Sequence, residues 1–163
     1  MHRFVSIDPG THTGYFIFDI CKDNKIIFRE CKSVTITQAL KLVLEQKKLF
    51  GDNFSLILED ARLCRWAGKH GLETHQGVGS IKRDCKIWED FCLENNIMVW
   101  LVNPIKIKNK KLKKAEFEQV FKLYGLKTNP HSRDAIAIGM QYGLLNYMLI
   151  NNPNFKKSII NYM

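Results

Sequence analysis

The stretch Arg3-Phe4-Val5-Ser6-Ile7-Asp8-Pro9-Gly10 opens the chain with a short apolar run that ends in a carboxylate. Arg3 to Ile7 is predicted to form a strand, and the residues after Asp8 a glycine-containing turn. A carboxylate at the polar end of a buried strand is costly unless its charge is used. Asp8 is therefore a candidate site residue, with a plain turn residue before Pro-Gly as the alternative.

The rest of the chain predicts an α/β protein in which an antiparallel meander precedes alternating helices and strands. The further predicted strands are Tyr15–Ile20, Ile26–Cys31, Phe54–Leu58 and Ile97–Val102. The predicted helices are Thr37–Leu49 with Thr37 as N-cap, Ser80–Asn95, Ala115–Tyr124 and Arg133–Leu149. Residues 61–77 show no clear period and are predicted to form an exposed loop or a broken helix. The sheet is therefore mixed, with helices on its faces.

The length of 163 residues predicts a single domain, 1–163, with its own core, and the last dozen residues are expected to be loose. Lys and Arg number 25 against 16 Asp and Glu, which gives a net charge of +9. This excess favours a polyanionic partner, nucleic acid first, with a generic basic surface as the alternative.

The five cysteines form no C-x-x-C pair and do not indicate a zinc site or a disulfide framework. A reducing, cytoplasmic environment is the expectation. The N-terminus lacks a signal-peptide pattern, and no apolar run reaches the length of a membrane span. We therefore expect a cytoplasmic protein with no membrane partner.

Two further acids stand in contexts like that of Asp8. Glu59 ends the predicted strand Phe54–Leu58, and Asp134 lies where a helix rich in small residues begins. Each has an ordinary alternative: a solvated strand end for Glu59, and complementation of the helix dipole for Asp134. Together they suggest one metal centre, because Mg²⁺ prefers carboxylate oxygens and two such ions roughly 4 Å apart assist phosphodiester hydrolysis. Mn²⁺ is expected to substitute.

The chain resembles RuvC-type Holliday junction resolvases of the ribonuclease H-like superfamily, and most of all their small bacteriophage members. Ser6-Ile7-Asp8-Pro9-Gly10 with Thr13-Gly14-Tyr15 resembles the first-strand motif, and Leu58-Glu59-Asp60 stands where the second acid ends the fourth strand. Residues 77–84 resemble the glycine-led start of the next helix, and His131-Ser132-Arg133-Asp134-Ala135 the last-helix motif. The resemblance implies a five-stranded mixed sheet and a homodimeric Mg²⁺-dependent endonuclease that cuts four-way junctions. It also implies that the protein acts in the cytoplasm of a bacterial cell or of a phage-infected host.

One departure concerns the last helix, where many such resolvases carry a D-x-x-D pair. His131 takes the place of the first acid, three residues before Asp134. A neutral imidazole there would ligate one metal or position the attacking water, as in some members of the family. A helix-start residue after Pro130 is the alternative.

Basic residues predict the DNA contacts. Six lysines lie within residues 104–114, where flexible ammonium groups suit phosphates without reading base sequence. The resemblance adds a catalytic role for Lys114, which matches a family residue that contacts the scissile phosphate. A loop after Glu59 mixes cations with an aromatic ring that could stack on an unpaired base, and a third group begins the helix behind the glycines, where backbone N–H groups could also hold phosphate. The predicted contacts are Lys106, Lys108, Lys110, Lys113 and Lys114; Arg62, Arg65, Trp66 and Lys69; and Lys82 and Arg83.

Two alternatives to a junction-resolving nuclease remain open at this level. One is a less selective ribonuclease H-like nuclease acting on branched DNA or RNA–DNA hybrids. The other is a junction-binding protein that cleaves poorly because His131 replaces an acid. The residues Ile81, Cys85, Trp88 and Cys92 would line a dimer interface or pack on the chain's own sheet.

Overall fold

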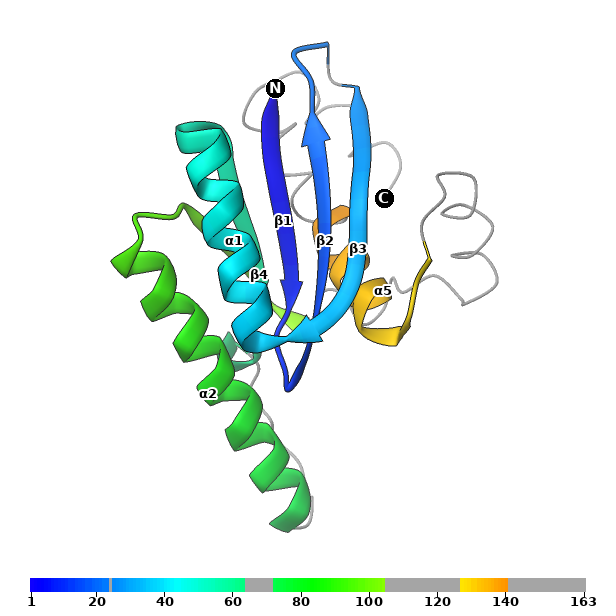
Figure 1. The fold of residues 1–163 in the computed structure, drawn as a ribbon. Helices are drawn as coiled ribbons and strands as arrows, with labels where there is room; N and C mark the ends of the chain where they lie inside the picture. Colours follow the sequence, from blue (N-terminus) through cyan, green and yellow to red (C-terminus); the bar gives the residue numbers. More distant parts are fainter. Residues whose placement is uncertain (24, 64–71, 105–126, 141–163) are drawn as a thin grey trace, which may run out of the picture.

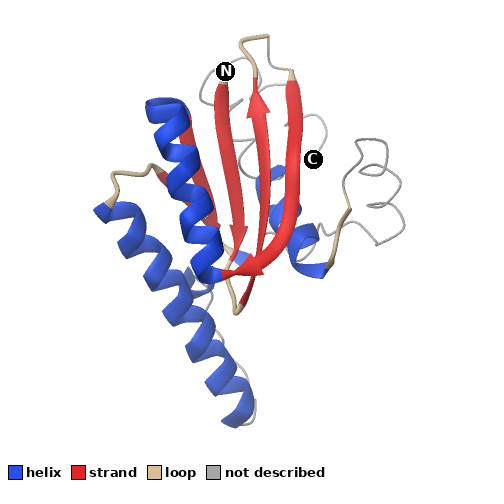
Figure 2. Ribbon diagram, viewed as in Figure 1, coloured by secondary structure: helices blue, strands red, loops and turns tan. Residues whose placement is uncertain are grey.

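The computed structural model describes residues 1–23, 25–63, 72–104 and 127–140, which form one five-stranded sheet with helices on both faces (Figures 1 and 2). The strands are β1 (His2–Asp8), β2 (His12–Ile20), β3 (Ile26–Thr35), β4 (Phe54–Glu59) and β5 (Val99–Val102). The helices are α1 (Ile36–Phe50), α2 (Leu72–Glu94) and α5 (Pro130–Ile138), with short 3₁₀ turns at Gly51–Asn53 and Ala61–Leu63. The predicted helix Ala115–Tyr124 and the last dozen residues lie outside the described residues.

The sheet has the order β3-β2-β1-β4-β5. β1 pairs antiparallel with β2, and β2 antiparallel with β3, with a register shift between Ile17 and Phe18. On its other side β1 pairs parallel with β4, and β4 parallel with β5. The predicted meander followed by parallel strands is therefore confirmed.

Each face of the sheet carries its own core, because the side chains of a strand alternate between faces. Phe4, Phe16 and Ile57 belong to the cluster that α5 covers. Val5 and Leu58, each next in sequence to a residue of the first face, belong to the cluster that α1 and α2 cover. Figure 1 shows α1 and α5 on opposite sides of the sheet and the first half of α2 extending past the edge where β1 ends.

Several element boundaries differ from the prediction. β2 begins at His12, inside the predicted turn, and β3 continues to Thr35. Thr35, not Thr37, is the N-cap of α1, because its side chain and that of Gln38 form a capping box. β5 begins at Val99 instead of Ile97.

The largest correction concerns residues 61–77, which were predicted to be a loop or a broken helix. α2 begins at Leu72 and continues through the glycines at positions 77 and 79. Glycine disfavours a helix by only about 1 kcal/mol, which packing and helix length can override. The glycines therefore lie inside the helix and do not mark its start.

Within the described ranges, no helix combines the length and the apolar character that crossing a bilayer requires. The four cysteines of these ranges, Cys21, Cys31, Cys85 and Cys92, are free thiols.

A buried ion-pair cluster holds the end of the sheet where β1 starts. The carboxylate of Asp19 has no exposed surface and accepts hydrogen bonds from the guanidinium groups of Arg3 and Arg29. Arg3 also donates to Gln46 at 2.6 Å and lies over the Phe50 ring, which ties α1 to the sheet. Burial raises the pKa of Asp19, but the two arginines lower it by more, so that it lies below its ordinary value.

This depressed pKa predicts a defined acid destabilisation. A carboxyl group whose folded pKa lies below its unfolded pKa stabilises the fold above the unfolded value, and that stability is lost as the pH falls through the folded pKa. We expect Asp19→Asn to lower the free energy of unfolding at pH 7 and to flatten its decline below about pH 4. Denaturant unfolding between pH 2.5 and 7 measures both effects. An unchanged acid slope would show that Asp19 is not the titrating group.

Candidate active site

Two carboxylates stand side by side at the carboxyl edge of the sheet. Ile7 lies opposite Leu58 in the parallel pair of β1 and β4, so that the next residues, Asp8 and Glu59, end the two strands at the same level. Alternation places both on the face that α5 covers, which is also the face of Ile57. The sequence prediction that these acids meet is consistent with this register.

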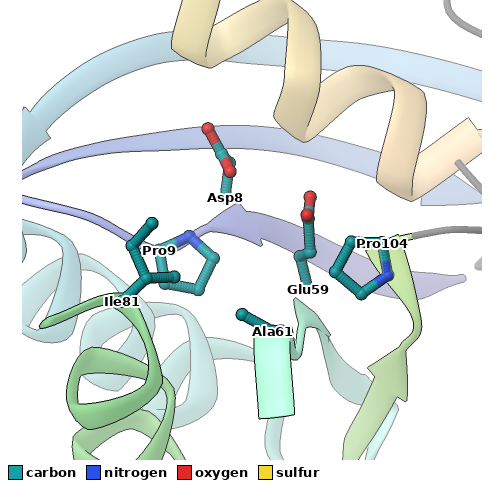
Figure 3. Close-up of a pocket in the computed structure, with 6 residues that line it drawn as sticks. All are labelled: Asp8, Pro9, Glu59, Ala61, Ile81 and Pro104. Carbon is teal, nitrogen blue, oxygen red and sulfur yellow. The ribbon is translucent and has the colours of Figure 1, made fainter. Parts of the chain in front are cut away.

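Asp8 and Glu59 line one pocket with a volume of about 140 Å³. Figure 3 shows both side chains extending in the same direction from the ends of their strands. The rest of the lining is apolar and comes from Pro9, Ala61, Ile81 and Pro104. The side chain of Asp8 is 19% exposed, so that solvent reaches it only in part. The pocket thus places two carboxylates, whose oxygens are hard metal ligands, next to an apolar wall.

Helix α5 brings His131 to this pair. Asn129 caps the helix through a capping box with Ser132, and Pro130 occupies its first turn. His131 Nδ1 lies 3.7 Å from Asp8 Oδ2, and its side chain is 47% exposed. Asp134 follows one helical turn later and is half-buried. Neither residue lines the pocket, so α5 contributes at its margin.

The close approach of α5 depends on small residues, as the sequence predicted. A Cβ at Gly14, which pairs with Asp8, would lie 2.1 Å from the carbonyl oxygen of His131. Farther along α5, a Cβ at Gly139 would lie 2.5 Å from Ser6 Oγ. The Ser6 hydroxyl donates to the Ala135 carbonyl at 2.7 Å. The helix therefore rests almost directly on β1 and β2, which keeps His131 within reach of Asp8.

The donor set suits a hard divalent cation in its chemistry. Asp8 and Glu59 supply carboxylate oxygens, and His131 adds an imidazole nitrogen next to Asp8. Among the residues that the structure describes, however, no three His, Cys, Asp or Glu side chains are grouped closely enough to hold one metal ion. The centre is thus formed by two adjoining carboxylates, with the α5 donors beside them.

Asp60 and Arg62 have roles that the sequence did not identify. Asp60 lies on the opposite face from Glu59, because successive side chains at a strand end alternate between faces, and it is almost fully buried. Its carboxylate accepts three hydrogen bonds from Arg62, and Arg62 Nη1 donates to Glu89 at 2.8 Å. Arg62 was predicted to contact DNA, but its guanidinium is bound to two protein carboxylates because the turn at Ala61–Leu63 folds it back onto α2.

Lys82 and Arg83 lie on α2 directly after the pocket residue Ile81. The Arg83 side chain is 72% exposed, and its nearest acid is Asp84 at 3.9 Å. Both residues thus follow a pocket residue on the same helix without lining the pocket, and their contact with phosphate stays a prediction. The further prediction that backbone N–H groups behind the glycines hold phosphate is wrong, because these groups lie inside α2 and not at its first turn.

Of the four residues proposed for a dimer interface, three are buried within the chain itself. Cys85, Trp88 and Cys92 have no exposed surface, and Trp88 and Cys92 belong to the cluster under α1 and α2. Ile81 is 39% exposed and lines the pocket. Cys85, Trp88 and Cys92 therefore have no surface left for a second subunit to bury.

The remaining predicted contacts lie outside the described residues. They are Arg65, Trp66 and Lys69 of the loop after β4, and Lys106, Lys108, Lys110, Lys113 and the catalytic candidate Lys114 of the lysine-rich segment.

His12 is a neighbour of the site that sequence reasoning missed. It begins β2, is exposed, and its ring centroid lies 6.0 Å from that of His131. The signal available was its position four residues after Asp8, which a hairpin returns to the same edge of the sheet.

Comparison with known proteins gives a consistent picture of the fold. No protein-family model and no curated protein sequence matches the chain. Among solved structures, RuvC of Thermus thermophilus in complex with a Holliday junction substrate is 20% identical with a TM-score of 0.59, over 91% of this chain and 96% of that one. The yeast mitochondrial Holliday junction resolvase Ydc2 is 13% identical with a TM-score of 0.55, over 97% of this chain and 84% of that one. The chain thus shares the fold of these two proteins, which is the fold that the resemblance in its sequence predicted.

Proposed function

Starting from this fold, we propose that the chain is a metal-dependent endonuclease that resolves four-way DNA junctions. The observation that carries the proposal is the pair Asp8 and Glu59 in one pocket, with His131 3.7 Å from Asp8. The structural relatives named above are Holliday junction resolvases, and this chain matches 96% and 84% of their lengths. The net charge of +9 supports a polyanionic substrate.

In this proposal Asp8, Glu59, His131 and Asp134 hold divalent cations, Mg²⁺ in the cell, with Mn²⁺ as a substitute and two ions per site. When bound, such ions make a water molecule more acidic and stabilise the leaving oxygen of a phosphodiester. Asp8 and Glu59 present oxygen donors from rigid strand ends, which fixes their separation. His131 Nδ1 faces the Asp8 carboxylate and orients it or takes a proton from the attacking water.

The apolar wall has a separate task. Pro9, Ala61, Ile81 and Pro104 exclude water from one side of the two carboxylates. Electrostatic interactions strengthen where water is excluded, so the wall increases the effect of each donor on the scissile phosphate.

Paired cuts across a junction need two active centres, and this chain contributes one. We therefore include in the proposal a homodimer with twofold symmetry. Sedimentation of the chain with and without junction DNA tests this part independently of cleavage.

The deciding experiment is incubation of the chain with a synthetic four-way junction in Mg²⁺ or Mn²⁺. Symmetric nicks on opposite strands are expected, with none in the presence of a chelator. If the chain cuts an RNA–DNA hybrid equally well, it is a general ribonuclease H-like nuclease and is not selective for junctions. Tight junction binding without cutting would favour a second candidate, a junction-binding protein. The lack of three grouped metal ligands among the described residues is the observation that favours this second candidate.

The cations beside the pocket give a prediction about binding. We expect the double variant Lys82→Ala, Arg83→Ala to weaken junction affinity. The slope of log K against log salt should become shallower by about 1 to 2, because fewer counterions are released on binding when a phosphate contact is lost. Binding assays at salt concentrations from about 50 to about 200 mM measure the slope. Lys48→Ala, at the far end of α1, is the control for charge and should leave the slope unaltered. An unaltered slope in the double variant would remove this part of α2 from the DNA interface.

A further inference from the structure

The backbone at Glu59 and Asp60 is held by α2 and by β5. Cys85 Sγ lies 3.5 Å from the Glu59 carbonyl oxygen and donates a weak hydrogen bond to it. The next residue, Asp60, donates its backbone N–H to the Val102 carbonyl at 2.8 Å, which ties this point to β5. The strand end that carries Glu59 is therefore held from two directions by backbone contacts.

A side-chain clamp, formed by Asp60, Arg62 and Glu89, adds the strongest of these ties. Arg62 Nε and Nη2 donate to the two oxygens of Asp60 at 2.8 and 2.7 Å, and the Arg62 backbone N–H donates to Asp60 Oδ1 at 2.9 Å. The remaining arm of the guanidinium donates to Glu89 Oε2 on α2 at 2.8 Å. A bidentate pair between Arg and a carboxylate fixes geometry as well as charge, and here one partner is buried.

The clamp connects directly to the pocket. Ala61 lies between the two clamp residues Asp60 and Arg62 and forms part of the pocket wall. Ile81, eight residues before Glu89 on α2, forms another part. The distance between the end of β4 and α2 thus sets both the place of Glu59 and the width of the pocket.

The clamp also controls charge near the site. Asp60 is adjacent in sequence to Glu59, and an unpaired carboxylate there would repel phosphate. The guanidinium of Arg62 lies against both oxygens of Asp60, so the negative charge of Asp60 is paired within the protein. The Arg62 hydrogen bond lowers the pKa of Glu89.

We propose that Arg62 is a positioning residue that fixes the carboxylate of Glu59 for metal binding by clamping Asp60, at the end of β4, to Glu89 on α2. The proposal rests on the proposed metal-dependent nuclease and assigns Arg62 to the protein scaffold, not to DNA. Groups that orient metal ligands typically affect metal affinity by about 10- to 100-fold.

Arg62→Lys tests this proposal with the mildest change. A lysine retains a cation for Asp60 but cannot bind Asp60 at both oxygens and reach Glu89 at the same time. We expect half-maximal cleavage to need about tenfold more Mg²⁺, with cleavage at saturating Mg²⁺ within about threefold of wild type. Junction affinity and its salt slope should be those of wild type, because Arg62 contacts no phosphate. A salt slope lower by about 1 would assign Arg62 to DNA and overturn the proposal.

A second readout does not depend on cleavage. Electron paramagnetic resonance of free Mn²⁺ during titration measures metal affinity without DNA, and Arg62→Lys should weaken it by about tenfold. Glu89→Gln keeps a hydrogen-bond acceptor for Arg62 but loses the negative charge, so it should weaken Mn²⁺ affinity by a smaller factor. If Arg62→Lys fails to fold, Glu89→Gln serves as the test variant in its place. Lys86→Ala is the matched control, because Lys86 also pairs with Glu89, at 3.4 Å, yet does not touch Asp60.

The outcomes separate the two proposals. A wild-type chain that binds Mn²⁺ but cuts no junction refutes the nuclease and still reports on the clamp. Mn²⁺ affinity equal to wild type in folded Arg62→Lys and Glu89→Gln overturns the clamp and leaves the nuclease intact. A wild-type chain that binds no Mn²⁺ overturns both.

Discussion

Replacing Asp8 with Asn is expected to lower the rate of junction cleavage by about a thousandfold or more, because a lost metal ligand removes several kcal/mol of transition-state stabilisation. Asp8 occupies the end of the central strand β1 and faces both Glu59 in the pocket and His131 on α5. Cleavage under single-turnover conditions, with Mg²⁺ varied, measures the loss.

Junction binding should respond in the opposite sense. Asp8→Asn removes a negative charge from a site that approaches phosphate, so that affinity without metal should stay equal or increase. Glu59→Gln and Asp134→Asn should behave alike, which distinguishes lost chemistry from lost binding. Asp23→Asn, at the exposed turn between β2 and β3, controls for charge and should cleave normally. If any of the three site variants cuts at the wild-type rate, that residue is not a ligand.

The sequence predicted the two strand carboxylates because strands impose a simple rule. Short continuous apolar runs identify β1 and β4, and the residue that ends each run must lie at the edge of the sheet. Parallel neighbours bring their carboxyl ends together, so Asp8 and Glu59 meet once the order β1-β4 is known. That order followed from the resemblance to a known fold and not from the local pattern.

Helix starts were predicted less well, for two different reasons. The start of α5 was readable, because Asn129-Pro130 with Ser132 is a capping sequence that places the first turn at Pro130 and not at Arg133. The start of α2 was not, because the glycines at 77 and 79 indicate a break in the local pattern. Packing of Trp88 and Cys92 under the sheet favours the long helix, and such packing is not visible in a local window.

Arg62 shows a limit of a different kind. A positive charge next to a predicted active site suggested that Arg62 contacts DNA. Its actual partner, Glu89, lies 27 residues away in the sequence. Only the turn at Ala61–Leu63 and the path of α2 bring the two together. His12 is similar, since a hairpin was needed to bring it to His131. Partners across elements are fixed by tertiary structure, which periodicity does not encode.

Gly14→Ala is expected to have the second largest effect, on stability and on cleavage together. The new Cβ would lie 2.1 Å from the carbonyl oxygen of His131, and a backbone atom in a helix cannot turn aside. Forced overpacking of this kind costs about 3 kcal/mol, so the free energy of unfolding should fall by that amount. Relief requires α5 to move away from β2, which separates His131 from Asp8. Cleavage should therefore be strongly reduced even at temperatures where the variant is folded.

Two other glycines provide graded controls for this prediction. At Gly10, in the turn between β1 and β2, a Cβ would meet only the His12 carbonyl oxygen at 3.8 Å, so Gly10→Ala should be nearly neutral. At Gly139 it would meet the Ser6 hydroxyl, which can rotate, and the Phe18 ring, so Gly139→Ala should fall between the two. Denaturant unfolding and single-turnover cleavage of all three rank the effects. If Gly14→Ala is as stable and as active as Gly10→Ala, α5 does not rest on β2 at this point, and the placement of His131 beside Asp8 loses its structural basis.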